Sequence, residues 1–138
     1  MTADLTYLAL SAALCAVMWI PYILARIQSW GLVNAVGYPE NPPAVPKWAE
    51  RAQRAHLNMV ENLIPLAALI LVGRELGADP TTMAWGAALF FWGRVVHWIV
   101  FIAGIPWVRT VAFALAWVGI AIAFFGVLGA EGVGAASG

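Results

Sequence analysis

The chain has 138 residues, of which 63% are hydrophobic and only 10% are Asp, Glu, Lys or Arg. An average soluble domain carries roughly 25% charged residues, so this composition excludes a water-soluble monomer and a disordered chain, and a formal net charge of zero excludes a nucleic-acid binder. We therefore expect an integral, multi-pass membrane protein.

Four segments have the length and apolar character of membrane-spanning helices: residues 5–25, 55–76, 83–105 and 108–130. Long apolar runs favour helices over the alternating strands of a membrane barrel. Pro21 is expected to kink the first helix, because proline removes a backbone donor. We expect one all-α membrane domain over residues 1–138, a four-helix bundle, with a disordered tail at 132–138.

The basic residues predict the orientation of the chain. The connection between the first two spans and its flanks carry four of them: Arg26, Lys47, Arg51 and Arg54. The connection between the last two spans carries Arg109, whereas the termini contain acids only. The positive-inside rule then places these two connections in the cytoplasm and both termini outside it.

Ionisable residues within spans indicate where function lies, because a lone charge at mid-bilayer costs at least ~2.5 kcal/mol and needs a protein partner. Arg54, Asn58 and Glu61 fall at i, i+4 and i+7, which forms one stripe on a helix. Arg94 and His97 are three residues apart on the third span. A rise of 1.5 Å per residue puts Glu61 and Arg94 at similar depth. We expect them to pair inside a polar pocket in the cytoplasmic half of the bundle.

Each of these residues also has a purely structural interpretation. The Glu–Arg pair can simply fix the register of two helices, and Asn58 and Asn62 are more often interhelical hydrogen-bond partners than ligands. His97 alone is more often a core histidine than a metal ligand. His56 is distant in spacing and no third ligand is evident, so no metal site is predicted. Interfacial anchoring is the corresponding alternative for three arginines: Arg26, Arg51 and Arg109.

The second predicted helix carries the segment ERAQRAHLNMVEN at residues 50–62, followed by Pro65. This segment resembles the signature of the MAPEG superfamily, approximately E-R-x-x-R-A-x-x-N-x-x-E-x-x-x-P. The superfamily comprises membrane-associated proteins of eicosanoid and glutathione metabolism. Arg94 with His97, and Arg109 before the last apolar run, match in order and spacing. The resemblance covers essentially the whole chain and extends to bacterial-type members.

The resemblance implies a homotrimer with glutathione as cosubstrate, bound between subunits on the cytoplasmic side, and no metal. It implies a transferase or peroxidase in which the glutathione thiolate attacks a lipophilic small molecule that enters from the membrane lipids. Arg109 then has the catalytic function of stabilising the thiolate. The implied glutathione-binding residues are Arg26, Arg54, Asn58, Glu61, Arg94 and His97, with Arg51, Gln53, Asn62 and Phe101 as possible contributors. Arginines suit the carboxylates of the peptide, and a glutamate suits its ammonium.

One departure from the family pattern leaves other functions open. Several members have tyrosine where this chain has Asn62 and Phe101. A non-catalytic membrane trimer that binds a lipid or a thiol ligand is therefore an alternative. A small transporter or proton-pathway protein is a less favoured one, because the chain lacks inverted repeats.

Overall fold

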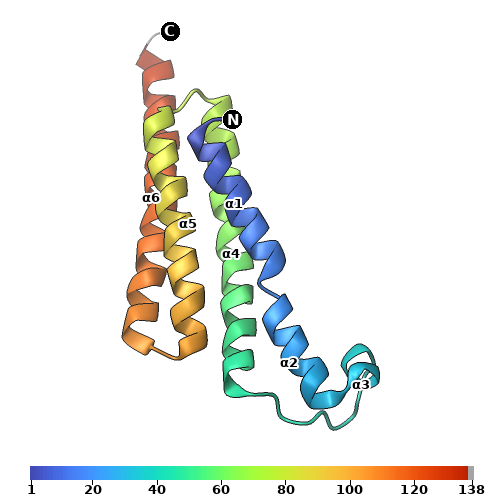
Figure 1. Cartoon of the computed structure of the whole chain (residues 1–138). Coiled ribbons are helices and arrows are strands. Elements are labelled where there is room, and N and C mark those ends of the chain that lie inside the picture. Colours follow the sequence, from blue (N-terminus) through green and yellow to red (C-terminus); the bar gives the residue numbers. More distant parts are fainter. Residues whose placement is uncertain (137–138) are drawn as a thin grey trace.

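The computed structural model describes residues 1–136, and these residues form helices and connecting loops without strands. The helices are α1 (Ala3–Val17), α2 (Ile20–Trp30), α3 (Leu32–Val36), α4 (Lys47–Glu75), α5 (Pro80–Ala103) and α6 (Pro106–Ala136). The helices α4, α5 and α6 are long rods, and α1 continued by α2 forms another beside them (Figure 1). The all-α class predicted from the sequence is confirmed.

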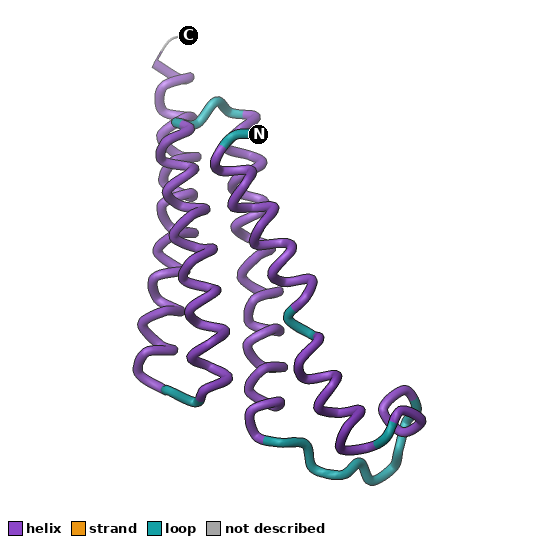
Figure 2. The backbone as a smooth tube through the Cα atoms, viewed as in Figure 1, coloured by secondary structure: helices purple, strands orange, loops and turns teal. Residues whose placement is uncertain are grey.

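Four segments are long and apolar enough to cross a membrane: Ala3–Trp30, Lys47–Glu75, Pro80–Ala103 and Pro106–Ala130. The start of α1 and the end of α6 lie at one end of the bundle, and the α2–α4 connection and the α5–α6 turn lie at the other (Figures 1 and 2). The predicted tail at 132–138 overlaps the end of α6, and residues 137–138 lie outside the described residues. Disorder of the tail therefore stays a prediction.

The first span bends before Pro21 and continues past its predicted end at Ala25. Helix α1 ends at Val17, and α2 begins at Ile20 with the proline in its first turn. Proline lacks the N–H that the Val17 carbonyl, four residues earlier, would accept, so the helix opens on the N-terminal side of the ring. As a result α1 packs against α4 and α5, whereas α2 follows α4 (Figure 1).

Helices α5 and α6 approach each other through small residues. A Cβ atom placed on Gly119 would lie 2.6 Å from the Gly86 carbonyl oxygen and 2.7 Å from the Phe90 nitrogen. A Cβ on Gly93 would lie 2.9 Å from the Ala116 nitrogen. Within lipid, where helix association depends on close packing, such small residues allow the two backbones to touch. This hairpin is the tightly packed half of the bundle.

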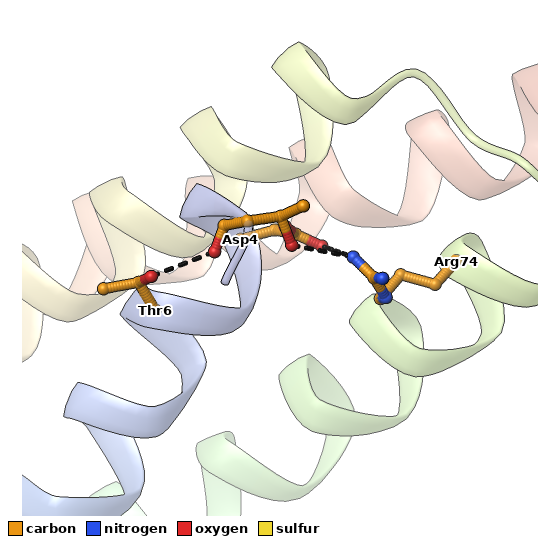
Figure 3. A network of polar contacts seen from close by, with 4 residues as sticks. Asp4, Thr6 and Arg74 are labelled. Atoms are coloured by element: carbon orange, nitrogen blue, oxygen red, sulfur yellow. Dashed lines mark hydrogen bonds and ion pairs between the residues drawn. The ribbon is translucent and has the colours of Figure 1, made fainter.

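Polar contacts fasten the end of the bundle where the chain starts. Arg74 Nη1 lies 3.3 Å from Asp4 Oδ2 and donates to Thr2 Oγ1 at 2.8 Å, which joins α1 to α4 (Figure 3). Asp79 caps α5, accepting from the Thr82 N–H at 2.8 Å and the Thr82 hydroxyl at 2.7 Å. These hydrogen bonds from Thr82 hold the pKa of the Asp79 carboxyl below its usual value.

We expect Gly119→Ala to lower the melting temperature of the detergent-solubilised protein. The new Cβ would overlap the α5 backbone and separate the two helices, and overpacking of this kind costs about 1–3 kcal/mol. Gly129→Ala in the same helix is the control, because nothing lies within 4 Å of its Cβ position. Equal melting temperatures for the two variants would contradict the close α5–α6 packing.

Candidate functional site

Arg94 lies at the centre of a polar cluster between α4, α5 and α6, and only 1% of the residue is exposed. Its Nη1 donates to Asn58 Oδ1 at 2.6 Å. The guanidinium carbon lies 5.2 Å from the ring centroids of both Phe90 and Phe113, so an aromatic ring from each of α5 and α6 flanks the cation. Nε and Nη2 are buried and have no hydrogen-bond partner among the described residues. The site therefore holds a buried positive charge with two unused donors.

The predicted Glu61–Arg94 pair is wrong. Arg94 bonds Asn58, and Glu61 lies on an exposed face of α4. Three residues separate Asn58 from Glu61, which amounts to about 4.5 Å along the helix axis and about 60° around it. The depth estimate from the sequence was accurate only to about one turn, and one turn decides which residue on α4 meets the guanidinium.

A series of aromatic contacts links Arg94 to the end of α5 and the start of α6. His97 is 3% exposed, and its ring lies 5.2 Å from that of Phe101 and 6.1 Å from that of Phe113. The guanidinium carbon of Arg109 lies 4.6 Å from the Phe101 ring centroid. The structure thus brings Asn58, Arg94, His97, Phe101 and Arg109 together in one chain. Phe101 supplies a ring face here, with no hydroxyl.

Arg26 and Gln53 belong to a separate group between α2 and α4. Arg26 Nη2 donates to Gln53 Oε1 at 3.5 Å, and the guanidinium lies 4.9 Å from the Trp30 ring centroid. On the same side of α4, Tyr22 Oη and His56 Nδ1 are 3.0 Å apart. Gln53 and Asn58 are five residues apart, or about 140° around the helix. Within one chain, Arg26 and Arg94 therefore lie on different flanks of α4.

Arg51 and Asn62 donate hydrogen bonds to backbone carbonyls of the helices. Arg51 Nε donates to the Ile102 carbonyl oxygen at 3.0 Å, so it binds a free carbonyl at the C-terminal end of α5. Asn62 Nδ2 donates to the Asn58 carbonyl oxygen at 2.8 Å, one turn earlier on α4. Both side chains are already engaged within the protein, which favours a structural function for these two predicted contributors.

Arg54 and Glu61 lie on an exposed face of α4, which no described part of a single chain covers. They share this face with Leu57 and Ile64, which are 54% and 66% exposed. The face lies between the flank that carries Arg26 and the flank that carries Arg94, as the helical periodicity requires. A charged stripe at this depth is unsuited to contact with lipid. Another protein surface or a polar ligand is needed to cover it.

Sequence reasoning missed the aromatic partners of the cations. Phe90 precedes Arg94 by four residues, and this spacing brings side chains together on a helix. Phe113 reaches Arg94 from a different helix, so its contact has no local signal in the sequence. The Tyr22–His56 contact was also missed, because it joins residues 34 positions apart and depends on how α2 is rotated. The sequence carries no local signal for it.

These features define a polytopic helical membrane protein with an arginine-rich polar site in one half of its bundle. No group of His, Cys, Asp and Glu that could hold a metal is found in the described part of the chain. The model of the MAPEG family matches residues 8–129, and the chain belongs to this family. The resemblance of the segment at residues 50–62 to the family signature is thereby confirmed.

The chain is also similar to microsomal glutathione S-transferase 1 from Homo sapiens, with 39% identity over 57 residues. That match covers 41% of this chain and 37% of the human protein. The similarity therefore extends over little more than a third of the relative's length.

We expect Asn58→Leu to destabilise the protein by about 1.5–3 kcal/mol, because it removes the hydrogen bond that the buried Arg94 guanidinium makes and leaves that cation without a polar partner. Asn62→Leu is the matched control, since the Asn62 amide bonds only the backbone of its own helix. Thermal unfolding in detergent measures both. A loss for Asn62→Leu as large as that for Asn58→Leu would show that the Asn58–Arg94 bond is not what matters.

Proposed function

We propose that the chain is a membrane-bound glutathione-dependent transferase or peroxidase that acts on hydrophobic electrophiles. The observation that carries the proposal is the buried Arg94, which among the described side chains has two donor nitrogens without a partner and forms no ion pair. An anionic ligand is the natural partner of such a group. Membership of the MAPEG family and the local similarity to a glutathione transferase support glutathione as that ligand.

The proposed site has a group for each charged end of glutathione. The peptide carries two carboxylates, an ammonium and a thiol. Arg54 and Arg94 suit the carboxylates, because a guanidinium can donate two parallel hydrogen bonds. Glu61, which does not pair with Arg94, suits the ammonium. Asn58 and His97 line the site beside Arg94 and add hydrogen-bonding groups.

The reaction requires the thiol of glutathione as its anion. A guanidinium close to sulfur favours the thiolate over the thiol, and in our proposal Arg109 does this. Its stacking on Phe101 holds the side chain near the end of α5, on the side of Arg94 and His97. The thiolate sulfur would form a bond to the electrophilic carbon, and the leaving group would depart with the electron pair of the broken bond. The second substrate would enter laterally from the bilayer.

We further propose that a second copy of the chain completes the site, in a homotrimer. The uncovered face of α4 with Arg54 and Glu61 supports this, since contact with another subunit would remove its charges from lipid. The neighbouring subunit would bring its own Arg26 group, which lies on the other flank of α4. The site would face the cytoplasm, in keeping with the distribution of basic residues.

One observation favours a non-catalytic alternative, in which the trimer binds a lipid or a thiol ligand without turnover. The ring beside His97 is that of Phe101, and the Tyr22 hydroxyl is bonded to His56 on the other flank of α4. In a single chain the site thus lacks a tyrosine hydroxyl for the sulfur. Measured turnover with a lipophilic electrophile would exclude this alternative.

Two arginine variants test the proposed mechanism. We expect Arg109→Ala to lose most of the ultraviolet absorbance of bound thiolate, with little change in glutathione affinity. Stabilisation of the anion by about 3 kcal/mol corresponds to roughly a hundredfold change in the thiolate-to-thiol ratio. We expect Arg54→Ala to weaken binding first, because it removes a carboxylate anchor.

Lysine variants are the matched controls. Arg109→Lys should restore part of the thiolate signal, because a point charge suffices for sulfur, whereas Arg54→Lys should restore binding poorly. Wild-type thiolate formation by Arg109→Ala at saturating glutathione would refute the catalytic function of Arg109. Failure of the wild type to bind millimolar glutathione would refute the proposed function as a whole.

A further inference from the structure

The short helix α3 and the tyrosine after it form an apolar projection at one end of the bundle. We call Leu32, Val33, Val36 and Tyr38 the interfacial patch; their exposed fractions are 62%, 85%, 76% and 101%. Helix α3 packs against α2 and stands beyond its end, to the side of the long helices (Figure 1). Four large apolar side chains here have almost no protein cover.

The projection is nevertheless held in a defined conformation by a glycine turn and hydrogen bonds. Gly31 has φ +75°, a backbone conformation that favours glycine, and it turns the chain from α2 into α3. Asn34 Nδ2 donates to the Trp30 carbonyl oxygen at 3.1 Å, and the Trp30 indole N–H donates to the Pro43 carbonyl oxygen at 2.6 Å. The second bond closes the loop at its base. These contacts fix the patch in place without burying it.

The apolar positions also share one face of the helix. Leu32, Val33 and Val36 lie within about 100° of its circumference. Asn34 turns back to bond the end of α2, and Ala35 is half-buried. A short helix with one apolar face outward, whose polar side chain bonds the preceding helix, is suited to an apolar environment outside the protein.

The position of the patch identifies that environment. It lies in the connection between two membrane spans, Ala3–Trp30 and Lys47–Glu75, at the level where both leave the bilayer. Lys47 and Trp48 begin α4 at this end, and Arg26 lies over the Trp30 ring. Indoles and cations at such a level fit the headgroup layer and its phosphates. Glu40 is the single acid of the connection at residues 31–46.

We propose that the interfacial patch docks into the boundary between headgroups and acyl chains of the surrounding bilayer, as an anchor beside the spans. The lipid surface is favoured over a second copy of the chain, because the patch continues the apolar exterior of the spans and is flanked by cations. Docking would hold the end of α2, and with it Arg26, at a fixed height relative to the membrane.

The test places a fluorescent NBD label on the full chain through Val33→Cys, with Glu40→Cys in the same connection as the matched control. The wild type, labelled in parallel, reports any reaction at Cys15, the single native cysteine. Val36→Cys repeats the measurement on the same face if the Val33 variant folds poorly. The proteins are reconstituted in phosphatidylcholine–phosphatidylglycerol vesicles, with nitroxide-labelled lipid as one quencher and aqueous iodide as the other.

We expect the label at position 33 to be quenched by the nitroxide lipid and protected from iodide, and the label at position 40 to show the reverse. Quenching at position 33 by iodide alone would overturn the proposal. Protection from both quenchers would also overturn it and would indicate cover by a second copy of the chain. Equal lipid quenching at both positions would show that α3 has no special affinity for the bilayer.

Discussion

A buried guanidinium determines how this bundle is arranged. Arg94 is placed in an apolar helix within lipid, where an uncompensated charge is costly. The positive charge is compensated by the amide oxygen of Asn58, which accepts a hydrogen bond, and by the aromatic rings of Phe90 and Phe113. These groups come from α4, α5 and α6, so satisfying a single side chain sets the relative positions of three helices. The compensation is incomplete, because Nε and Nη2 of the guanidinium have no hydrogen-bond partner in the part of the chain that the structure describes.

The rest of the fold supports this arrangement by dividing the bundle into a tight part and an open part. Helices α5 and α6 touch along their glycines, which keeps Phe90 and Phe113 in place on either side of Arg94. Helix α2, by contrast, diverges from α5 after the bend at residues 18–19. Among the long helices, it packs along α4. The polar half of the protein is therefore tightly packed on the α5–α6 side and more open on the α2 side.

Local rules predicted the parts of the structure that depend on neighbouring residues. The apolar runs gave the spans, and the spacing of Asn58, Arg94 and His97 placed them at one site. Contacts between helices escaped prediction where a rotation of about 60° or a shift of one turn decides the partner. Glu61 was paired with Arg94 for this reason. The Tyr22–His56 contact depends on how far α2 rotates after the bend, which the presence of Pro21 alone does not determine. No sequence pattern predicts that Arg109 stacks on Phe101, because the turn between α5 and α6 sets that geometry.

We propose that the donors of Arg94 that lack a partner in the described structure bind an anionic ligand. The double variant Arg94→Met/Asn58→Leu tests it most directly, because it removes the buried charge together with the one hydrogen-bond partner that the described residues give it. Replacing a buried polar pair by apolar groups of similar volume is often neutral or stabilising. A ligand that binds the folded protein at a hundred times its dissociation constant stabilises it by about 2.7 kcal/mol. We predict that the variant melts, without ligand, at or above the wild-type temperature, and that millimolar glutathione raises the melting temperature of the wild type only. A variant that is stable and still shows the full glutathione-dependent rise would contradict the account.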